Sequence, residues 1–291
     1  DVLVVGAGIS GILAAKNAAK NNFKTLLVDE KNELGGATIY QNREFNIIDG
    51  LSSSDWIKKE IQELKDIKNL EIKTRTSVAA YHGYNYLLAR ENLTDHLEKK
   101  DKQGKIRQRL LKIRAKKVIL ATGALERPLI FNNNDRPGIM LSSAVKKYAD
   151  FYGVISGKKS VFFTNNDSAY ESALCLHNKG IKVEAVIDIR EKSESKIVKA
   201  VEDAGIAIHW SHTIVDTKGY KRLNSISVMK LSNDGLSVTG NKIDISCDCL
   251  GVAGGWTPAV HLFTQSGGKL TFDENDKVFL PNKYPSDQLS V

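Results

Sequence analysis

Three glycines near the start of the chain have the spacing of a turn that binds phosphate. Gly6, Gly8 and Gly11 form the pattern G-x-G-x-x-G directly after the apolar run "VLVV". Gly6 permits a tight turn, Gly8 lets a pyrophosphate approach the backbone, and Gly11 lets helix and strand pack closely. The N–H groups at the helix start, around Ile9 and Ser10, present a partial positive charge to the phosphates. The sequence therefore predicts a dinucleotide site in this turn.

Acidic residues follow at the end of the next strand-like stretch, "KTLLV". A carboxylate there can accept hydrogen bonds from both hydroxyls of an adenosine ribose, and it would repel a 2′-phosphate, which disfavours NADP. Asp29 and Glu30 compete for this role, and we expect Glu30, with Lys31 beside it, because Glu30 lies nearer the loop. The alternative is a strand-end acid that faces water. Gly35 and Gly36 follow and are consistent with backbone that lies against the ligand.

A third segment of the expected site ends a buried strand, "VILATG". Ala121, Thr122 and Gly123 lie where parallel sheets place their ligands, beyond the carboxyl ends of the strands. The alternative is ordinary tight packing after a strand.

These residues require a strand–helix–strand unit to position them, and the chain supplies two such units. Helix-like sequence follows the first turn, and alternating strands over residues 70–118 predict an antiparallel meander that leads back to "VILATG". Strands and helices alternate again from "SVFFT" to "IAIHW". The predicted fold is α/β, with two Rossmann-like three-layer domains of the glutathione-reductase type and a β-meander. Expected boundaries are 1–154 for the first domain, 155–274 for an inserted second domain, and 275–291 for the return.

The turn of the second unit contains no glycine. Thr164, Asn165, Asn166, Asp167 and Ser168 stand there instead. Their side chains would block close approach of a diphosphate to the backbone, and Asp167 would also repel it. We expect Asp167 and Ser168 to cap the following helix. The turn of the second strand–helix–strand unit is therefore predicted to bind nothing, or to bind something other than NAD(P)H.

Composition narrows the class of protein. The 291 residues include 42 Lys and Arg against 34 Asp and Glu, a net charge of +8, without a nucleic-acid motif. The apolar runs are strand-length, which predicts no membrane helix. Cys175, Cys247 and Cys249 have no metal-site or Cys-x-x-Cys spacing, so we expect no metal, no dithiol chemistry and a cytoplasmic location. The abrupt start at Asp1 suggests a fragment of a longer protein.

Several longer strings narrow the interpretation further. They are "VDEKNELGG", "IDGLSSSDW", "ATGALERPLIFNNNDRPGIMLSSAVKKYADFYGV", "FFTNNDSAYESAL" and "GVAGGWTPAVHLFTQSGGKLTFDE". The frame resembles the flavoprotein superfamily with two dinucleotide domains, and the strings resemble the alpha subunit of heterotetrameric sarcosine oxidase. The resemblance covers essentially the whole chain and identifies it as the nucleotide-binding middle of such a subunit.

The resemblance implies an assembly with beta, gamma and delta subunits. That assembly oxidises sarcosine, a CH-NH donor, to glycine, makes hydrogen peroxide and passes the one-carbon unit to tetrahydrofolate as 5,10-methylenetetrahydrofolate. It carries FAD and FMN in addition to NAD, and the resemblance puts no amine-oxidising catalytic residue on this chain. The implied NAD site comprises Gly6, Gly8, Gly11, Glu30, Gly35, Gly36, Thr122 and Gly123, with Val78 of the meander near the adenine.

Two other functions stay open at this point. The fingerprint fits FAD equally well, as in the alpha subunits of related opine or proline dehydrogenases or hydrogen cyanide synthase. A stand-alone FAD- and NAD(P)-dependent oxidoreductase is the third interpretation, and the eroded second turn and the absence of a dithiol motif argue against it.

Overall fold

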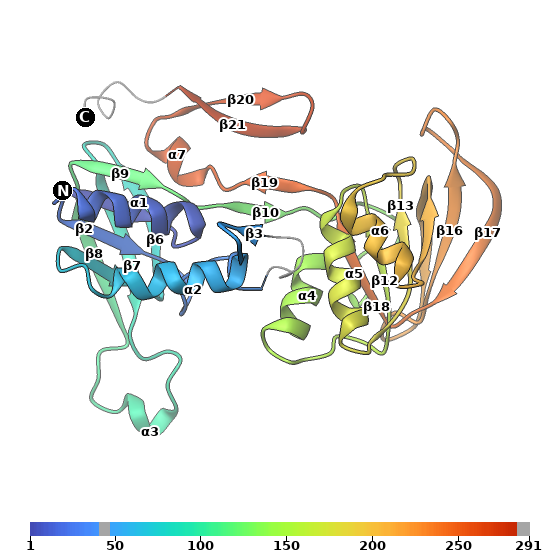
Figure 1. Ribbon diagram of the computed structural model, residues 1–291, viewed down its shortest axis with the longest axis horizontal. Helices are drawn as coiled ribbons and strands as arrows, with labels where there is room; N and C mark the ends of the chain where they lie inside the picture. Colours follow the sequence, from blue (N-terminus) through green and yellow to red (C-terminus); the bar gives the residue numbers. More distant parts are fainter. Residues whose placement is uncertain (41–46, 284–291) are drawn as a thin grey trace. The chain divides into compact units, whose positions relative to one another are not determined.

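The computed structural model describes residues 1–40 and 47–283, which Figure 1 colours along the chain. The chain divides into two compact units: Asp1–Leu125 with Thr257–Val291, and Glu126–Trp256. The expected boundaries, 154/155 and 274/275, both lie later in the chain than these.

The first unit is built on a parallel sheet in the order β5-β2-β1-β9. Its strands are β1 (Val2–Val5), β2 (Thr25–Val28), β5 (Leu70–Lys73) and β9 (Lys117–Leu120). Every residue of β1 is buried, because β2 and β9 pair with it on its two sides and other elements cover both faces. β9 lies at the edge of the sheet, where no further strand of the described residues pairs with it.

Two helices cover one face of this sheet. Helix α1 (Ile9–Lys20) buries Ile12 and Ala15 against β1 and β2. Helix α2 (Ser53–Leu64) adds Trp56, Ile57 and Leu64 to the same core, and the hydroxyl of its N-cap, Ser52, accepts a hydrogen bond from the Asp55 N–H. The small residues of α1 allow this close packing, while α2 supplies the bulk.

An antiparallel meander covers the opposite face. It consists of β6 (Thr76–His82), β7 (Tyr86–Asn92) and β8 (Gln108–Arg114), and the short α3 (Lys99–Lys102) lies between β7 and β8. Tyr81 and Leu87 pack against Leu3, Val5 and Val28 of the parallel sheet. The expectation of strands over 70–118 is corrected at its start, because β5 pairs in parallel with β2 and belongs to the first sheet.

Shorter elements complete the first unit. They are η1 (Thr38–Tyr40), β3 (Ile47–Ile48), β4 (Leu51–Ser52), α7 (His261–Gln265), β20 (Lys269–Asp273) and β21 (Val278–Lys283). Strands β10 (Ala124–Glu126) and β19 (Trp256–Pro258) pair with each other where the chain passes between the units.

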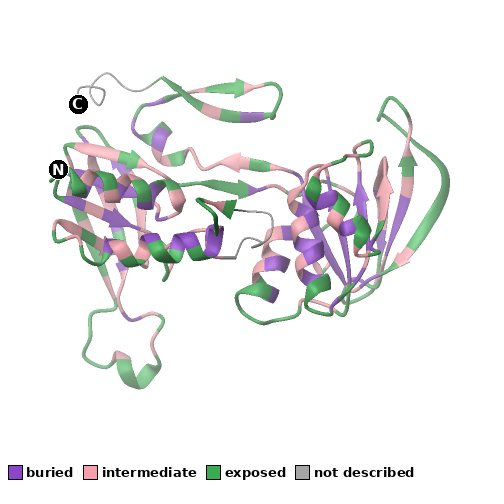
Figure 2. Cartoon of the chain, viewed as in Figure 1, coloured by how far each residue is buried: buried purple, intermediate pink, exposed green. Residues whose placement is uncertain are grey.

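The second unit repeats the parallel architecture with five strands in the order β11-β18-β12-β13-β14. These are β11 (Ile139–Leu141), β12 (Lys159–Thr164), β13 (Lys182–Asp188), β14 (Ala207–Trp210) and β18 (Cys249–Ala253). Its helices are α4 (Ser142–Asp150), α5 (Ser168–Asn178) and α6 (Lys196–Asp203). Most of β12, β13 and β18 is buried, as Figure 2 shows in purple.

A three-stranded antiparallel sheet covers the other face of this unit. Its strands are β15 (His212–Lys218), β16 (Ser225–Leu231) and β17 (Val238–Ser246). Ile226 and Val228 of β16 pack against Val161 and Phe163 of β12 and Ile187 of β13. The predicted three-layer arrangement is thus present in both units.

The difference in boundaries follows from packing at the two crossing points. β11 pairs with β18, and α4 packs on α5, so residues 139–150 complete the second unit's sheet and helix layer. Helix α7 packs against β6, which places it in the first unit. Within residues 1–40 and 47–283, no helix is both long and apolar enough to cross a bilayer.

Candidate functional site

The glycine turn after β1 is held by contacts that leave no room for side chains at two of its positions. Gly6 has φ +99°, and a Cβ there would lie 2.2 Å from the Ala121 carbonyl oxygen. A Cβ on Gly11 would lie 1.8 Å from the Gly6 carbonyl oxygen. These glycines therefore set the turn and the close packing of α1, as the spacing predicted.

Gly8 differs from its two neighbours in the motif. A Cβ on Gly8 would meet nothing within 4 Å, so its lack of a side chain leaves open space in front of the backbone. Gly8 is the N-cap of α1, without a side-chain cap and without an acid in the first turn. The first bond of the helix runs from the Ile12 N–H to the Gly8 carbonyl, so the amides of Ile9, Ser10 and Gly11 precede the helical ladder.

The structure separates the roles of Asp29 and Glu30. The Asp29 carboxylate accepts hydrogen bonds from the backbone N–H groups of Ala7 at 2.6 Å and Lys31 at 2.8 Å. Asp29 therefore braces the glycine turn with both oxygens. Glu30 is exposed, and among the described residues no hydrogen bond or ion pair engages its carboxylate. Of these two acids, Glu30 is thus the one whose carboxylate is available to an outside hydroxyl.

The segment after Glu30 folds back over the turn. The Gly35 N–H donates to the Ala7 carbonyl at 2.7 Å, and a Cβ on Gly36 would lie 2.9 Å from the Gly8 Cα. Both glycines have positive φ, +110° and +60°. The two predicted glycine segments are therefore packed against each other, and a side chain on Gly36 would collide with the turn.

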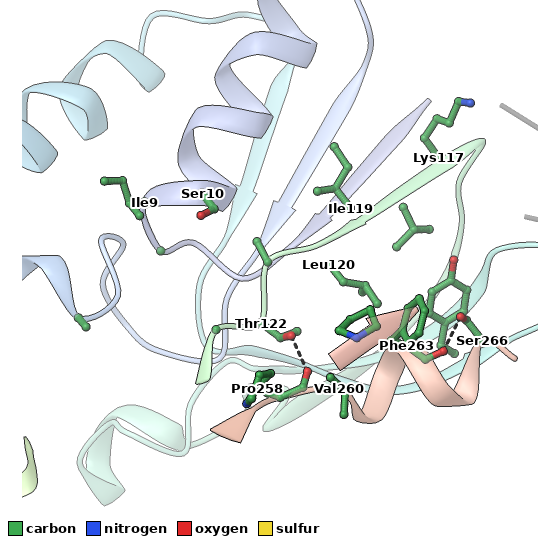
Figure 3. Close-up of a pocket in the computed structure, with 18 of the residues that line it drawn as sticks. Ile9, Ser10, Lys117, Ile119, Leu120, Thr122, Pro258, Val260, Phe263 and Ser266 are labelled. Atoms are coloured by element: carbon green, nitrogen blue, oxygen red, sulfur yellow. Dashed lines mark hydrogen bonds between the residues drawn. The ribbon is translucent and has the colours of Figure 1, made fainter. Parts of the chain in front are cut away.

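A cavity of about 900 Å³ opens beside this turn. Figure 3 shows Ile9 and Ser10 at the start of α1 on one side of it, and Thr122 and Pro258 on another. The Thr122 hydroxyl donates to the Ala259 carbonyl at 2.7 Å, which fixes the loop after β9. The cavity continues along β9 from Gly123 back to Lys117, at the free edge of the sheet. Its volume falls within the range of small-molecule sites.

The predicted site residues divide into three groups. Those that line the cavity are Gly8, Ile9, Ser10, Ala121, Thr122 and Gly123. Those that shape the turn from behind are Gly6, Gly11, Gly35 and Gly36. Glu30 and Lys31 lie at the end of β2 outside the cavity lining, and the half-buried Val78 packs against the core formed by Leu3, Val5 and Val28.

Sequence reasoning missed the lining residues that come from distant segments. Tyr81 and Asn85 of the meander line the cavity, together with Phe263 and Ser266 of the α7 region. Tyr81 donates its hydroxyl to the Asn85 side chain at 2.7 Å, and its backbone N–H donates to the Gln265 side chain. No local motif announces these residues, since their approach depends on α7 packing against β6.

The turn of the second unit also joins a parallel strand to a helix, but different residues occupy it. Counted from the strand end and the helix start, Asn165, Asp167 and Tyr170 stand where Gly6, Gly8 and Gly11 stand in the first unit. Asp188 ends β13, whereas Asp29 follows the end of β2, and each accepts a hydrogen bond from the N–H of the residue two positions further on. Each of the three glycine positions of the first turn therefore carries a side chain in the second turn. The Asp167 carboxylate, which stands where Gly8 leaves open space, would block and repel a diphosphate.

Those side chains bind one another. The Tyr170 hydroxyl donates to the fully buried Asp188 at 2.8 Å, and Arg190 forms ion pairs at 2.8 Å with both Asp188 and Asp167. Burial first, and then Asp188, raise the pKa of Tyr170. The Tyr170 ring also stacks on Trp210, with centroids 6.0 Å apart. The polar groups at the strand ends are thus satisfied from within the unit.

One detail of the expected capping is wrong. Asp167 is the N-cap of α5 but makes no side-chain capping bond, because its carboxylate pairs with Arg190. Asn166 caps instead, and its side-chain oxygen accepts from both the N–H and the hydroxyl of Ser168, at 2.9 and 2.6 Å.

Glu126, the last residue of β10, has a structural partner. Its carboxylate accepts from the Ser143 N–H at 2.9 Å, at the start of α4, and burial raises the pKa of Glu126. The backbone of Arg127 pairs with Gly254 and Gly255. These contacts belong to the second unit and do not contribute to the cavity at the glycine turn.

The three cysteines are free thiols, and two of them are buried. Burial raises the pKa of Cys247 to about 12 and that of Cys249 to about 11, and it also raises the pKa of the half-buried Cys175. Thiolate is the reactive form, so these thiols are poor nucleophiles. Among the residues that the structure describes, no group of three or more His, Cys, Asp or Glu is placed to hold a metal ion.

Known proteins resemble this chain at two levels. Sarcosine oxidase subunit alpha from Corynebacterium sp. strain P-1 is 39% identical over 99% of this chain, and the subunit from strain U-96 is 37% identical over 97%. The chain spans only 29% of the length of each of these relatives. The resemblance drawn from the sequence strings is confirmed.

The fold has close counterparts among solved structures. Thioredoxin reductase from T. acidophilum matches with a TM-score of 0.69 at 19% identity, over 100% of this chain and 90% of that one. This likeness confirms the predicted fold class. Residues 1–284 match the family described as pyridine nucleotide-disulphide oxidoreductase. With the glycine turn, the second Rossmann-like unit and this match over nearly its whole length, the chain belongs to the pyridine nucleotide-disulphide oxidoreductase family.

Proposed function

We propose that this chain is the nucleotide-binding part of the alpha subunit of a sarcosine oxidase, and that its first unit holds NAD. The relatives named as sarcosine oxidase alpha subunits support the assignment to that subunit. In the proposed cytoplasmic assembly, beta, gamma and delta subunits supply the FAD and FMN chemistry. There sarcosine is oxidised to glycine with release of hydrogen peroxide and 5,10-methylenetetrahydrofolate.

The observation that carries the NAD proposal is the division of labour at the first turn. Gly8 leaves open space in front of uncapped helix amides, which suits a pyrophosphate. Asp29 is committed to backbone N–H groups, so Glu30 remains for the ribose hydroxyls. Two carboxylates at this strand end would repel a 2′-phosphate, which favours NAD over NADP.

In this proposal the chain's own residues bind the nucleotide and hold it in position. A nicotinamide ring, once bound, can accept or donate a hydride, whereas the residues around the turn only bind and orient. The helix amides would hold the diphosphate, Glu30 the adenosine ribose, and Thr122 and Gly123 would border the part of the ligand beyond the phosphates. Lys31, Gly35, Gly36 and Val78 would complete the adenosine side. The amine-oxidising site is proposed to lie on another chain.

The decisive experiment identifies the nucleotide that the purified chain releases on denaturation, by mass spectrometry. We expect NAD and a colourless protein. Release of FAD, with flavin absorption at about 450 nm, would favour a dehydrogenase-type alpha subunit instead. Release of no nucleotide, together with no binding of added NAD, would overturn the proposal.

A matched pair of variants locates the site. Gly8→Val should abolish nucleotide retention while leaving the fold intact, because a Cβ at this position would meet nothing within 4 Å. Asp167→Val also introduces valine, at the corresponding position of the second turn, and should leave nucleotide retention unchanged. Equal occupancy in wild type and Gly8→Val would contradict the site assignment.

A further inference from the structure

A second cavity, of about 430 Å³, lies in the second unit and shares no residue with the glycine turn. It is lined by Pro137, Gly138, Met140, Tyr148, Val154 and Ser156, with Arg222 at its wall. Apart from Arg222 and Ser156, its lining is apolar or aromatic. Such a mixture of apolar surface and one strong donor is typical of recognition sites.

The apolar lining continues onto an exposed surface. Tyr148 is 44% exposed, Phe151 36%, Tyr152 55%, Val154 50% and Ile155 61%, all within the end of α4 and the segment after it. Figure 2 shows this end of α4 and the following segment in green. The rings of Phe151 and Tyr152 meet edge to face with centroids 4.9 Å apart. A contiguous exposed patch of this kind marks an interaction surface more often than a solvated one.

Backbone hydrogen bonds hold the cavity in shape. The Pro137 carbonyl accepts from the Leu223 N–H, and the Gly138 carbonyl accepts from the Leu250 N–H, each at 2.8 Å. The Tyr148 carbonyl accepts from the Val154 N–H at 2.8 Å, which folds the segment after α4 back onto the helix. The site is therefore largely formed before anything binds, which lowers the entropy cost of binding.

Arg222 is positioned without being neutralised by a direct ion pair. Its guanidinium donates to the carbonyls of Asp248 at 3.1 Å and Ser156 at 3.4 Å, and no carboxylate among the described residues forms a salt bridge with it. The Asp248 carboxylate is engaged by the N–H groups of Lys158 and Lys159. A guanidinium held this way keeps donors available for an incoming carboxylate.

Further positive charge lies next to the lining residues in the chain. Lys158 and Lys159 follow Ser156 in the chain, and Lys221 precedes Arg222; all three are exposed, and none has an ion-pair partner in the described part of the chain. Asp150, the acid at the end of α4, is paired with Lys179 at 3.1 Å. At the patch itself, the Lys147 ammonium lies 6.0 Å from the centre of the Phe151 ring and 5.6 Å from that of Tyr152. Basic residues therefore adjoin both the cavity lining and the apolar patch, and the chain as a whole has a net charge of +8.

We propose that this surface docks a segment of a partner protein that carries a bulky apolar side chain next to a carboxylate. The apolar side chain would enter the cavity beside Tyr148 and Val154, and the carboxylate would meet Arg222. The inference rests on the proposed function, in which this chain works as one subunit of an assembly.

The alternatives fit the surface less well. A small carboxylate would fill the cavity but leave the patch from Phe151 to Ile155 exposed. A second copy of this chain packed face to face would bring two basic edges together, since a two-fold interface places the same patch on both sides. A partner with acidic residues around an apolar anchor satisfies both the patch and its charge.

The test uses peptide selection on the whole chain. A phage-displayed library of random peptides is selected on the wild type, and binding of the enriched peptides is then measured by fluorescence polarisation. We expect the peptides to share an acidic residue beside an aromatic or aliphatic one. Arg222→Glu should weaken their binding by about tenfold or more, as expected for loss of a charge-assisted contact. Lys199→Glu, the same charge change on α6 outside the cavity lining, should have no effect.

Two further variants guard against misfolding. Arg222→Gln removes the charge with little change in shape, and Tyr148→Ala removes the apolar wall; both should weaken binding while circular dichroism stays unchanged. Enriched peptides without acids, or peptides that bind Arg222→Glu as well as wild type, would overturn the proposal. So would phenylpropionate binding as tightly as the peptides, which would indicate a small-carboxylate site.

A dimer of wild type that dissociates in Arg222→Glu, seen by sedimentation velocity, would assign the surface to a second copy and also overturn the proposal. Nucleotide content is measured on the same samples. If peptide binding fails while NAD is retained, only the docking surface is wrong. If NAD is absent while peptides bind through Arg222, only the cofactor assignment is wrong.

Discussion

The two units contain the same strand–turn–helix arrangement, but their turns differ. The comparison shows that a nucleotide-binding fold can be kept while the residues at its turn no longer suit a nucleotide. In the first turn Gly8 opens onto free space, and α1 begins without a side-chain cap. In the second turn Asp167 and Tyr170 occupy the corresponding positions and bind Arg190 and Asp188. In the second unit, side chains of the protein itself form hydrogen bonds and ion pairs with the polar groups at the turn, which a ligand would otherwise bind.

The aspartates at the two strand ends sharpen this contrast. Asp29 and Asp188 each accept the N–H two residues further on, from Lys31 and Arg190, at 2.8 and 2.9 Å. Their other oxygens differ in partner. Asp29 braces the backbone at Ala7, whereas Asp188 takes the Tyr170 hydroxyl. The local turn is thus retained in both units, and the choice of second partner decides whether the frame stays open.

The largest loss of stability is expected at the buried hydrogen bonds and ion pairs beside the second turn. Asp188→Ala should lower the free energy of unfolding of the second unit by about 3 kcal/mol, since it leaves Arg190 and the Tyr170 hydroxyl without their buried partner. Urea denaturation and hydrogen exchange of β13 measure the loss. Asp29→Ala, the matched change in the first unit, should cost less because it removes bonds to backbone amides only. An equal or larger loss in Asp29→Ala would break the comparison.

A smaller effect separates the two kinds of glycine within the first turn. Gly11→Ala should destabilise the first unit by about 2 kcal/mol, because the added methyl overlaps the Gly6 carbonyl. Helix propensity alone would predict the opposite sign, since alanine is the better helix former. Gly8→Ala is the control: in nucleotide-free protein it should destabilise the first unit less than Gly11→Ala does, because its Cβ would meet nothing within 4 Å. Stabilisation by Gly11→Ala would show that the close packing of α1 is not required.

Much of this frame was predictable from the sequence because its signals are local. The apolar run 2–5, the glycine spacing and the strand-end acids lie within one strand–helix–strand unit. The identity of the free acid was a preference only, since the bond between Asp29 and Ala7 depends on how the strand and turn meet. The closure of the second frame by Arg190, and the cavity wall formed by Phe263 and Ser266, depend on tertiary packing that no local pattern encodes.

The third test concerns binding and not stability. Glu30→Gln should weaken NAD binding by about tenfold, the effect of losing one charged hydrogen bond, with no change in unfolding. It should also reduce the discrimination against NADP, because one repulsive carboxylate is gone. Calorimetric titration of nucleotide-stripped protein measures both affinities. Glu33→Gln, a neutralised acid in the same loop, is the control, and equal weakening in both variants would assign the effect to general charge.

The smallest effect is a pH dependence confined to the second unit. Burial first, and then the neighbouring His212, lower the pKa of His209 below its ordinary value of 6.5. As the pH falls through 6.5, the unfolded chain takes up a proton that the folded His209 does not, so the free energy of unfolding should fall slightly.

His209→Gln should remove this part of the pH dependence. Hydrogen exchange of β14, which carries His209, measures the effect against β1 of the first unit as an internal reference. A slope that is the same in β1 and β14, or that survives His209→Gln, would contradict this origin.

The buried thiols have a practical consequence for studying the two units in motion. Cys247 and Cys249 remain protonated at neutral pH, so a maleimide dye will react slowly with them. Replacing Cys175 with serine would then leave a nearly silent background. Cysteines introduced at the exposed positions Lys24 and Lys199, one in each unit, would accept a donor and an acceptor dye. Single-molecule energy transfer could then report the distance between the units as nucleotide is added.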